Sequence, residues 1–238
     1  MIPLDMEIRG DSPPGSQTAA PFDLVAPIYP ALERLVFGLR LTEARKAFFD
    51  RVLEADRVLL VGEGNGRFLK SLIGRERVGS VKIVEKSHAM IRLMKNRVGC
   101  PRKVALEFIE ADFLRCRLRE QFDCVVTHFF LDLFNPPGQL DIINKLGEMT
   151  SENGTWINVD FTPPRALGGR VLMWLQYTFF RMVCGIEARR CFDESPMAAQ
   201  NGWIALASLS FLGGLVVAKR YQKGSVPAAS HTTPNTTG

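Results

Sequence analysis

Val58-Leu59-Leu60-Val61-Gly62-Glu63-Gly64-Asn65-Gly66 is the stretch that decides the fold, because an apolar strand runs directly into alternating glycines. A helical pattern follows at 67–73. Glycine lets a backbone turn sharply and approach a ligand, since no Cβ stands in the way. A helix that starts after such a loop adds free backbone N–H groups. The stretch predicts a strand–loop–helix unit that cradles a ligand, with a ligand-free tight turn as the alternative.

Strand-like and helical segments alternate downstream of this unit. The predicted strands are 57–61, 80–84, 105–109, 122–127 and 155–160, and the predicted helices are 67–73, 87–98, 138–149, 168–184 and 192–200. Such alternation indicates βαβ units and a parallel sheet covered on both faces. Two apolar runs around Gly213-Gly214 add a hairpin. We therefore expect an α/β fold with a doubly wound, mostly parallel seven-stranded sheet and an antiparallel C-terminal hairpin strand.

The chain reads as one domain between two tails. Apolar spacing predicts extra N-terminal helices at 22–38 and 42–53, the second capped by Thr42. Pro, Gly and Ser predict disorder in both tails. The expected organisation is a disordered tail (1–20), a domain (21–223) and a second disordered tail (224–238). Within the domain we expect an N-terminal helical lid (22–54), a cofactor-binding core (56–161), and a lid helix with terminal strands (162–223).

Composition and charge exclude several classes of protein. The 238 residues are 46% apolar and 23% charged, with a net charge of +5 that is scattered along the chain. This differs from the dense basic stripe of a nucleic-acid-binding protein, so we expect no nucleic-acid partner. The five cysteines form no Cys-x-x-Cys pair, which predicts no metal site and fits the reducing cytoplasm.

One uncharged segment raises the question of a membrane. Residues 203–218 carry no charge, but they are shorter than the roughly 20 residues that a spanning helix needs, and Gly213-Gly214 interrupts them. We interpret them as two core strands, with a transmembrane helix as the alternative.

Acidic residues stand at the ends of the next two predicted strands. In open parallel sheets, ligands bind outside the carboxyl ends of the strands. Glu85 ends one strand and can accept hydrogen bonds from both hydroxyls of a ribose. Asp112 follows the next strand and can accept one from the amine of adenine, while Phe113 packs on the ring. Taken alone, each acid could equally be a surface or helix-start charge.

With these features in order, residues 56–161 resemble the core of the class I (Rossmann-like) S-adenosylmethionine-dependent methyltransferases. Gly62–Gly66 matches the family's first motif, Glu85 its ribose-binding acid and Ala111-Asp112-Phe113 its adenine motif. Phe22–Tyr29 resembles the start of small-molecule methyltransferases, including those acting on quinones. The resemblance implies S-adenosylmethionine as the cofactor. The residues it implies as cofactor contacts are Gly62, Glu63, Gly64, Gly66, Glu85, Lys86, Asp112, Phe113 and Thr127.

The sequence departs from the family pattern at two places. Leu60 stands where the family usually has an acid that helps to organise the loop and the methionine end of the cofactor; Glu63 is a candidate to supply a carboxylate instead. The fourth strand ends in Thr127-His128-Phe129-Phe130. The family members that methylate amino groups of DNA bases or protein amides carry Asn-Pro-Pro-Tyr/Phe there, which argues against those substrates.

Three residues near the fourth and fifth strand ends are candidates for a general base. They are His128, Asp132 and, less directly, Asp160. A base is needed only if the acceptor must lose a proton. His128 could instead be a hydrogen-bonded structural histidine, and Asp132 could cap the following helix. The sequence leaves open whether O, N, C or S is methylated.

Residues outside the core must choose the acceptor, because the core supplies the cofactor half of the site. The predicted helix 168–184 is apolar and aromatic. We expect Tyr29, Trp174 and Tyr177 to contact a small, apolar or aromatic acceptor, with quinone-like or lipid-like molecules included. Simple core packing of these aromatics, and contact of the helix with a membrane surface, are the alternatives. The oligomeric state stays open.

Two rival functions compete with methyl transfer. A nicotinamide-dependent oxidoreductase would need Gly-x-Gly-x-x-Gly, but Arg67 occupies the sixth position and Asp112 would have no role. A non-catalytic binding protein that keeps the fold is the other alternative, because Leu60 replaces the family's acid.

Overall fold

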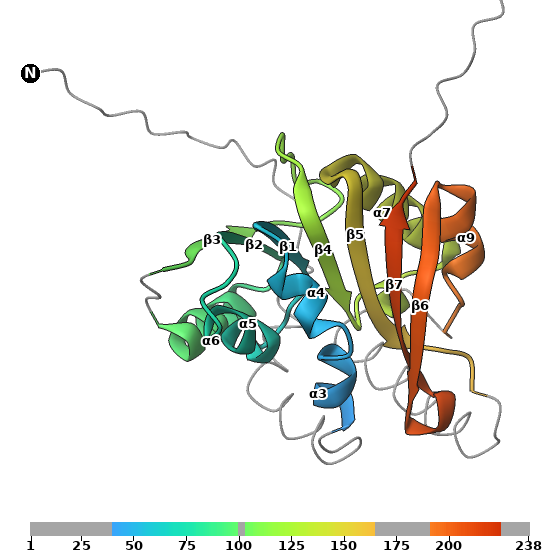
Figure 1. Ribbon diagram of the computed structural model, residues 1–238, viewed down its shortest axis with the longest axis horizontal. Coiled ribbons are helices and arrows are strands. Elements are labelled where there is room, and N and C mark those ends of the chain that lie inside the picture. The colour runs from blue at the N-terminus through green and yellow to red at the C-terminus, as the bar shows by residue number, and fades with distance from the viewer. Residues whose placement is uncertain (1–39, 100–102, 165–190, 225–238) are drawn as a thin grey trace, which may run out of the picture.

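The computed structural model describes residues 40–99, 103–164 and 191–224. These residues form one seven-stranded sheet with the order β3-β2-β1-β4-β5-β7-β6 (Figure 1). Strands β1 to β5 run parallel in their pairings, and β7 runs antiparallel to both β5 and β6. The predicted α/β class, with a mostly parallel sheet and an antiparallel hairpin strand, is confirmed.

The strand bounds follow the predictions closely except at β5. The strands are β1 Arg57–Val61, β2 Ser80–Glu85, β3 Ala105–Glu110, β4 Phe122–His128, β5 Thr150–Phe161, β6 Trp203–Phe211 and β7 Val216–Lys223. Strand β5 is longer than the predicted 155–160, because Phe122 of β4 pairs with Thr150 ahead of a register shift.

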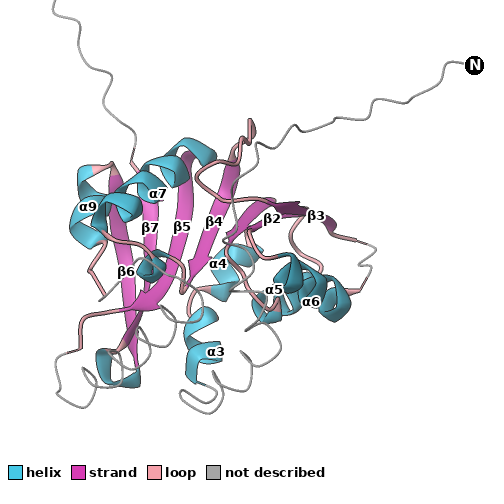
Figure 2. Cartoon of the chain, turned by 180° about the vertical axis from the view of Figure 1, so that it is seen from behind, coloured by secondary structure: helices cyan, strands magenta, loops and turns pink. Residues whose placement is uncertain are grey.

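Helices cover both faces of the sheet. One face packs against α3 (Arg40–Arg45), α4 (Phe49–Leu53), α5 (Arg67–Ile73) and α6 (His88–Val98). The opposite face packs against α7 (Pro136–Met149) and α9 (Ser195–Gln200). Figure 1 shows α3 and α4 in front of the sheet, and Figure 2 shows α7 and α9 in front when the molecule is turned round.

Local capping chemistry explains two of the helix starts. The Ser87 side chain accepts a hydrogen bond from the Met90 amide at 3.2 Å, and α6 begins there as predicted. Asn135 caps α7 through the Gly138 amide, with a proline at the first helical turn. The predicted start at 138 was therefore two residues late.

The prediction of one helix over 42–53 with Thr42 as its cap was wrong. Thr42 lies inside α3, and α3 and α4 are separate short helices. Between them the amides of Lys46 and Ala47 bond to carbonyls three residues earlier, which tightens the turn. Both helices place apolar side chains in the core, so packing on the sheet decides the break.

The uncharged segment 203–218 forms two strands joined by the short 3₁₀ turn Leu212–Gly214. This confirms the hairpin, but the expectation of two core strands was wrong for β6: it is the edge strand of the sheet, and its Ile204, Leu206 and Leu209 side chains are exposed. None of the helices within residues 40–99, 103–164 and 191–224 is long and apolar enough to cross a membrane.

Several predicted features lie outside the described residues. They are the tails, the helices at 22–38 and 168–184, and the acceptor contacts Tyr29, Trp174 and Tyr177.

Candidate functional site

The glycine loop sits at the carboxyl end of β1, between β2 and β4. Gly62, Gly64 and Gly66 have φ angles of +65°, +68° and +73°, a conformation that favours glycine. A Cβ on Gly62 would overlap the ring of Phe130, and one on Gly66 would lie 2.7 Å from the Met94 Cγ. A Cβ on Gly64 would meet no atom within 4 Å. The absence of a side chain at Gly62 and Gly66 therefore lets Phe130 and Met94 pack against the loop, whereas Gly64 faces open space.

Glu85, the predicted ribose-binding acid, lies against this loop. One carboxylate oxygen accepts the Gly64 amide at 3.2 Å, and the other accepts the Ser87 amide at 3.0 Å. These bonds fix the orientation of the carboxylate. The acid at the end of β2 and the open glycine are thus neighbours.

Asp112 and Lys86, both predicted cofactor contacts, are paired with each other. The Lys86 Nζ lies 3.2 Å from Asp112 Oδ2, and Asp112 Oδ1 accepts the Leu114 amide at 3.0 Å. Both side chains are partly solvent-exposed. An exposed pair of this kind is weak, so the carboxylate can exchange the lysine for another donor.

Phe113 is placed differently from its expected position on an adenine ring. Its side chain is 5% exposed and belongs to the core cluster beneath the sheet. The Lys145 Nζ lies 5.3 Å from the ring centroid, and the Phe130 ring lies 6.2 Å away. The structure gives Phe113 a packing role under Asp112.

Thr127, another predicted cofactor contact, is fully buried with its hydroxyl directed inward. The hydroxyl donates to Asn158 Oδ1 and accepts from Trp156 Nε1, both at 2.8 Å. These bonds use the hydroxyl proton and one acceptor position. The side chain therefore links β4 to β5 and is directed into the interior.

The Glu63 side chain binds backbone amides at the start of α5, the helix that follows its loop. One carboxylate oxygen accepts the amides of Phe68 and Leu69 at 3.0 and 3.1 Å. The cap position of α5 is Gly66, which has no side chain, so Glu63 supplies the missing cap from the loop. Burial raises its pKa to about 7, partly opposed by these amides and by Arg45.

Arg97 of α6 holds the other end of the loop. Its guanidinium donates to the Asn65 backbone carbonyl and to the Asn65 side-chain oxygen, the latter at 3.0 Å. The loop is thus pre-formed by contacts to α5, α6 and β2.

His128, the first base candidate, ends β4 in an apolar setting. It is 5% exposed, and its ring packs edge-on against Phe68 with centroids 4.6 Å apart. Neither ring nitrogen has a hydrogen-bond partner among the described residues. Burial, and then the charge of Arg45, hold the pKa of His128 well below its usual value. The imidazole is therefore neutral at pH 7.

Phe129 and Phe130 lie next to the glycine loop, and sequence reasoning gave neither of them a role. Phe129 has φ +54° and an amide bonded to the Val159 carbonyl at 2.7 Å. A non-glycine residue in this region is strained, and such strain clusters at functional sites. Phe130 covers Gly62. The unusual ending of the fourth strand was the available signal.

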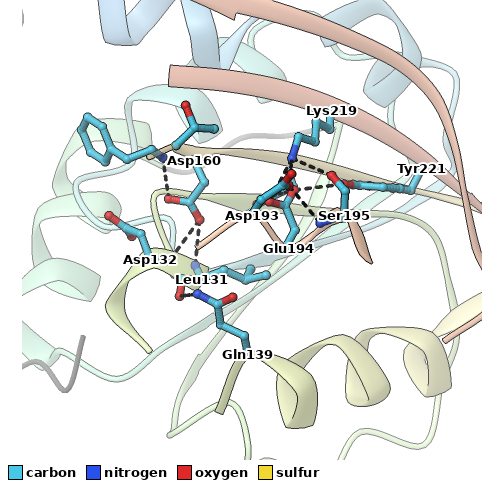
Figure 3. A network of polar contacts seen from close by, with 12 residues as sticks. Leu131, Asp132, Gln139, Asp160, Asp193, Glu194, Ser195, Lys219 and Tyr221 are labelled. Carbon is cyan, nitrogen blue, oxygen red and sulfur yellow. Dashed lines mark hydrogen bonds and ion pairs between the residues drawn. The ribbon is translucent and has the colours of Figure 1, made fainter. Parts of the chain in front are cut away.

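The two acidic candidates, Asp132 just after β4 and Asp160 near the end of β5, lie together (Figure 3). Asp160 Oδ2 accepts the amides of Leu131 and Asp132 at 3.0 and 3.2 Å, and Oδ1 accepts that of Phe161 at 3.0 Å. Burial, Asp132 and Glu194 raise the pKa of the Asp160 carboxyl well above its usual value. Asp132 is buried beside it. The two carboxyls form a pair that favours holding a proton.

A second buried polar network lies near this pair, at the start of α9 (Figure 3). Glu194 is 3% exposed and accepts bonds from Asn158 Nδ2, the Tyr221 hydroxyl and the Lys219 Nζ at 2.9, 3.0 and 3.1 Å. Lys219 also contacts Asp193 at 2.7 Å. The network ties the start of α9 to β5 and β7.

Comparison with known families shows what this region of the chain resembles. The family model for the methyltransferase domain matches residues 58–154, which contain the glycine loop, Glu85 and Asp112. Residues 58–154 thus match the methyltransferase domain family, and with the solved structures described next they support an S-adenosylmethionine-dependent methyltransferase. No curated protein sequence matches this methyltransferase significantly.

Solved methyltransferase structures share its fold at low sequence identity. The N-methyltransferase NodS from Bradyrhizobium japonicum WM9, in complex with S-adenosyl-L-homocysteine, has a TM-score of 0.59 and 12% identity over 83% of this chain and 98% of its own. Human N-acetylserotonin methyltransferase in complex with SAM has a TM-score of 0.63 and 13% sequence identity. The match covers 84% of this chain and 56% of that protein. An O-methyltransferase family protein from Burkholderia thailandensis has a TM-score of 0.63 and 13% sequence identity. The match covers 86% of this chain and 58% of that protein.

Within this methyltransferase the predicted site residues divide into two groups. Gly64, Glu85, Lys86 and Asp112 gather around the open side of the loop. Phe113 and Thr127 face the interior, and Glu63 caps α5. The family's missing acid corresponds to Leu60, whose side chain is 1% exposed in the core.

Proposed function

We propose that this methyltransferase transfers the methyl group of S-adenosylmethionine to a small, substantially apolar or aromatic acceptor, a class that includes quinone-like and lipid-like molecules. The cofactor lies along the carboxyl ends of the strands. Its adenosine end is at Glu85 and Asp112, and its sulfonium is near the ends of β1 and β4, at the topological switch point.

The observation that carries this proposal is the pair of half-buried aromatic residues directly after β4, Phe129 and Phe130. Phe130 packs edge-on against Phe134 with ring centroids 5.2 Å apart, and Phe129 lies 5.1 Å from Phe161. His128, the last residue of β4 before these rings, is neutral. Such surroundings favour an apolar acceptor, and they exclude water from the reactive sulfonium.

Methyl transfer is an in-line displacement, in which an acceptor lone pair forms a bond to the methyl carbon as the bond from sulfur breaks. Positioning supplies most of the catalysis. Where the acceptor must also lose a proton, the pair Asp132 and Asp160 is a better proton holder than His128. Burial raises the pKa of the Asp160 carboxyl, which favours its protonated form, and it lowers the pKa of the His128 imidazole, which disfavours its protonated form.

Turnover with radiolabelled S-adenosylmethionine tests the acceptor class. A panel of hydroxylated quinones, phenols and lipids is compared with polar amino acids, peptides and oligonucleotides. We expect label transfer to members of the first group only. Transfer restricted to polar amines, peptides or nucleic acid would contradict the proposal.

A variant pair tests the proton-holding step on any accepted phenol. General base catalysis contributes about 10²–10⁴ in rate, so Asp132→Asn should lower kcat by about that factor while the KM for S-adenosylmethionine stays unchanged. His128→Asn should have a much smaller effect on kcat. The reverse ranking would assign the step to His128.

A non-catalytic methyltransferase-fold protein is the second candidate, and Leu60 is the observation that favours it. The family's loop-organising acid is absent there, although Glu63 holds α5 from a different place. Cofactor binding by titration, with no transfer to any acceptor in the panel, would support this candidate.

A further inference from the structure

The two edges of the sheet differ in how they are protected from pairing with another chain. β3 forms one edge and β6 forms the other (Figure 1). On β3, Glu107 and Glu110 are exposed, and the Lys95 Nζ lies 5.4 Å from the centroid of the Phe108 ring. Charged side chains of this kind discourage an edge strand from pairing further. β6, by contrast, contains no charged residue and no proline over Trp203–Phe211.

Apolar side chains are exposed along β6. Ile204, Leu206 and Leu209 are 55%, 45% and 45% exposed. Leu209 pairs with the fully buried Ala218 of β7, so the apolar core reaches this edge of the sheet. Within the part of the chain that the structure describes, β7 is the only strand that pairs with β6. The outer backbone N–H and C=O groups of β6 can therefore pair with a further strand.

A bulge divides β6 into two parts. The pairing with β7 shifts between Ala205 and Ala207, and Leu206 is left out of the register. A bulge bends the strand and disrupts the ladder of hydrogen bonds, so the first part of β6 is a poor template for another strand. From 207 to 211 the pairing with β7 is regular. This second part is therefore where a further strand would pair.

The sequence of this second part is complementary to itself in the antiparallel direction. Residues directly opposite each other in an antiparallel pair lie on the same face of the sheet. A two-fold axis at the centre of the segment would place Leu209 opposite its copy, Ala207 opposite Phe211, and Ser208 opposite Ser210. Each apolar side chain would then meet an apolar one, and each hydroxyl would meet a hydroxyl.

The charges near β6 do not oppose such a pairing. The cations beside its second part are Lys219 and Arg220 of β7. Lys219 forms ion pairs with Asp193 and Glu194 at 2.7 and 3.1 Å. In a joined sheet the β7 strands of two copies would lie three strand spacings apart, about 14 Å. This exceeds the Debye length of about 8 Å at physiological ionic strength, so repulsion between them is largely screened.

We propose that two copies of this chain associate through residues 207–211 of β6, which pair antiparallel about a two-fold axis and join the two sheets into one. Two-fold contacts of this kind are the commonest in homo-oligomers. The pairing would satisfy the outer backbone groups of β6 and bury Leu209 in both copies. The contact is separate from the glycine loop, because β4, β5 and β7 lie between β6 and β1. It is therefore independent of the proposed acceptor.

The oligomeric state of the full chain tests this contact. Sedimentation velocity over about 1–100 µM, a range that detects micromolar association, should show a monomer–dimer equilibrium. Leu209→Lys should weaken the dimer by at least about 100-fold, because both copies lose a buried leucine and two like charges stand opposite each other. Leu140→Lys is the matched control, since Leu140 is 37% exposed on α7, and it should dimerise like the wild type. Circular dichroism checks that both variants fold.

A mixture of two variants tests the position of the axis. Leu209→Glu alone should also be monomeric, but an equal mixture of Leu209→Glu and Leu209→Lys should dimerise, because opposite charges then meet at the axis. A wild type that is monomeric over the whole range, a Leu209→Lys variant that dimerises like the wild type, or a mixture without recovery would overturn the proposal. Hydrogen-exchange protection of the 207–211 amides that does not depend on protein concentration would overturn it as well, since a segment of the same chain would then cover this edge.

Discussion

Gly62 and Gly64 have nearly the same backbone conformation but opposite surroundings. Positive φ costs any L-residue roughly 1–2 kcal/mol, so this penalty applies to both. A side chain on Gly62 also overlaps Phe130, whereas one on Gly64 enters open space. Gly62→Val should therefore lower the free energy of unfolding by about 1–3 kcal/mol more than Gly64→Val, the usual cost of overpacking.

The two variants should rank in the opposite order for S-adenosylmethionine binding: Gly64→Val should lose more affinity, although Gly62→Val loses more unfolding free energy. In the proposed cofactor orientation, Gly64→Val places side-chain atoms where the cofactor lies, so S-adenosylmethionine binding should be lost while the fold survives. Urea denaturation and calorimetric titration measure the two effects. Equal destabilisation, or unchanged binding in Gly64→Val, would contradict the assignment of Gly64 to the ligand.

Glu63 makes the loop sensitive to pH. Its folded pKa is raised from 4.5 to about 7. The stability linked to its protonated form is therefore fully present below pH 4.5 and is lost as the pH rises through about 7. Glu63→Gln keeps an oxygen that accepts the Phe68 and Leu69 amides but does not titrate.

The measurement for Glu63 is the free energy of unfolding at pH 5 and pH 8. The wild type should lose more stability between these values than Glu63→Gln does. An identical loss in both proteins would show that Glu63 is not the titrating group.

At the scale of elements, α9 depends on Glu194 more than on its own sequence. Residues Ser195–Gln200 form a six-residue helix, which is too short to be stable alone. Glu194 anchors it to Asn158, Lys219 and Tyr221. Each of these partners would lose a buried acceptor if the carboxylate were removed.

Glu194→Ala should therefore cost about 3–5 kcal/mol of unfolding free energy, the range for breaking a buried ion pair. Glu76→Ala is the control, since Glu76 pairs with Lys103 at 2.5 Å on the surface and should cost below about 1 kcal/mol. Urea denaturation checks both. A cost below about 1 kcal/mol for Glu194→Ala would show that α9 is held by its apolar contacts.

At the scale of the whole molecule, the cofactor should stabilise the fold as one unit. The loop is held by α5, α6 and β2, so a ligand on the loop stabilises the elements that meet there. A ligand at about 100 times its Kd adds about 2.7 kcal/mol. For a domain of this size, that predicts a rise in Tm of about 5–10 °C.

Thermal unfolding with increasing S-adenosylhomocysteine measures this shift. If Glu85 accepts hydrogen bonds from the ribose, as proposed, Glu85→Ala should lose about 2–4 kcal/mol of binding, and the shift at the same concentration should be largely abolished. A Tm that does not respond to the ligand in the wild type would contradict binding to the native state.

The sequence by itself determined the order of the strands and helices, the glycine loop and the two acids that follow β2 and β3. These features depend on local chemistry: apolar periodicity, positive φ at glycine, and caps such as Ser87. It also indicated the unusual end of the fourth strand. The break between α3 and α4 carried no such local signal.

Only the tertiary structure decided where individual side chains find their partners. Thr127 faces Asn158 because β4 and β5 pair in that register, and a shift of one residue would direct it to the other face. Glu63 caps α5, and Glu194 meets Lys219 across a separation of 25 residues. Such contacts depend on how distant segments pack, and no periodicity in the chain encodes them locally.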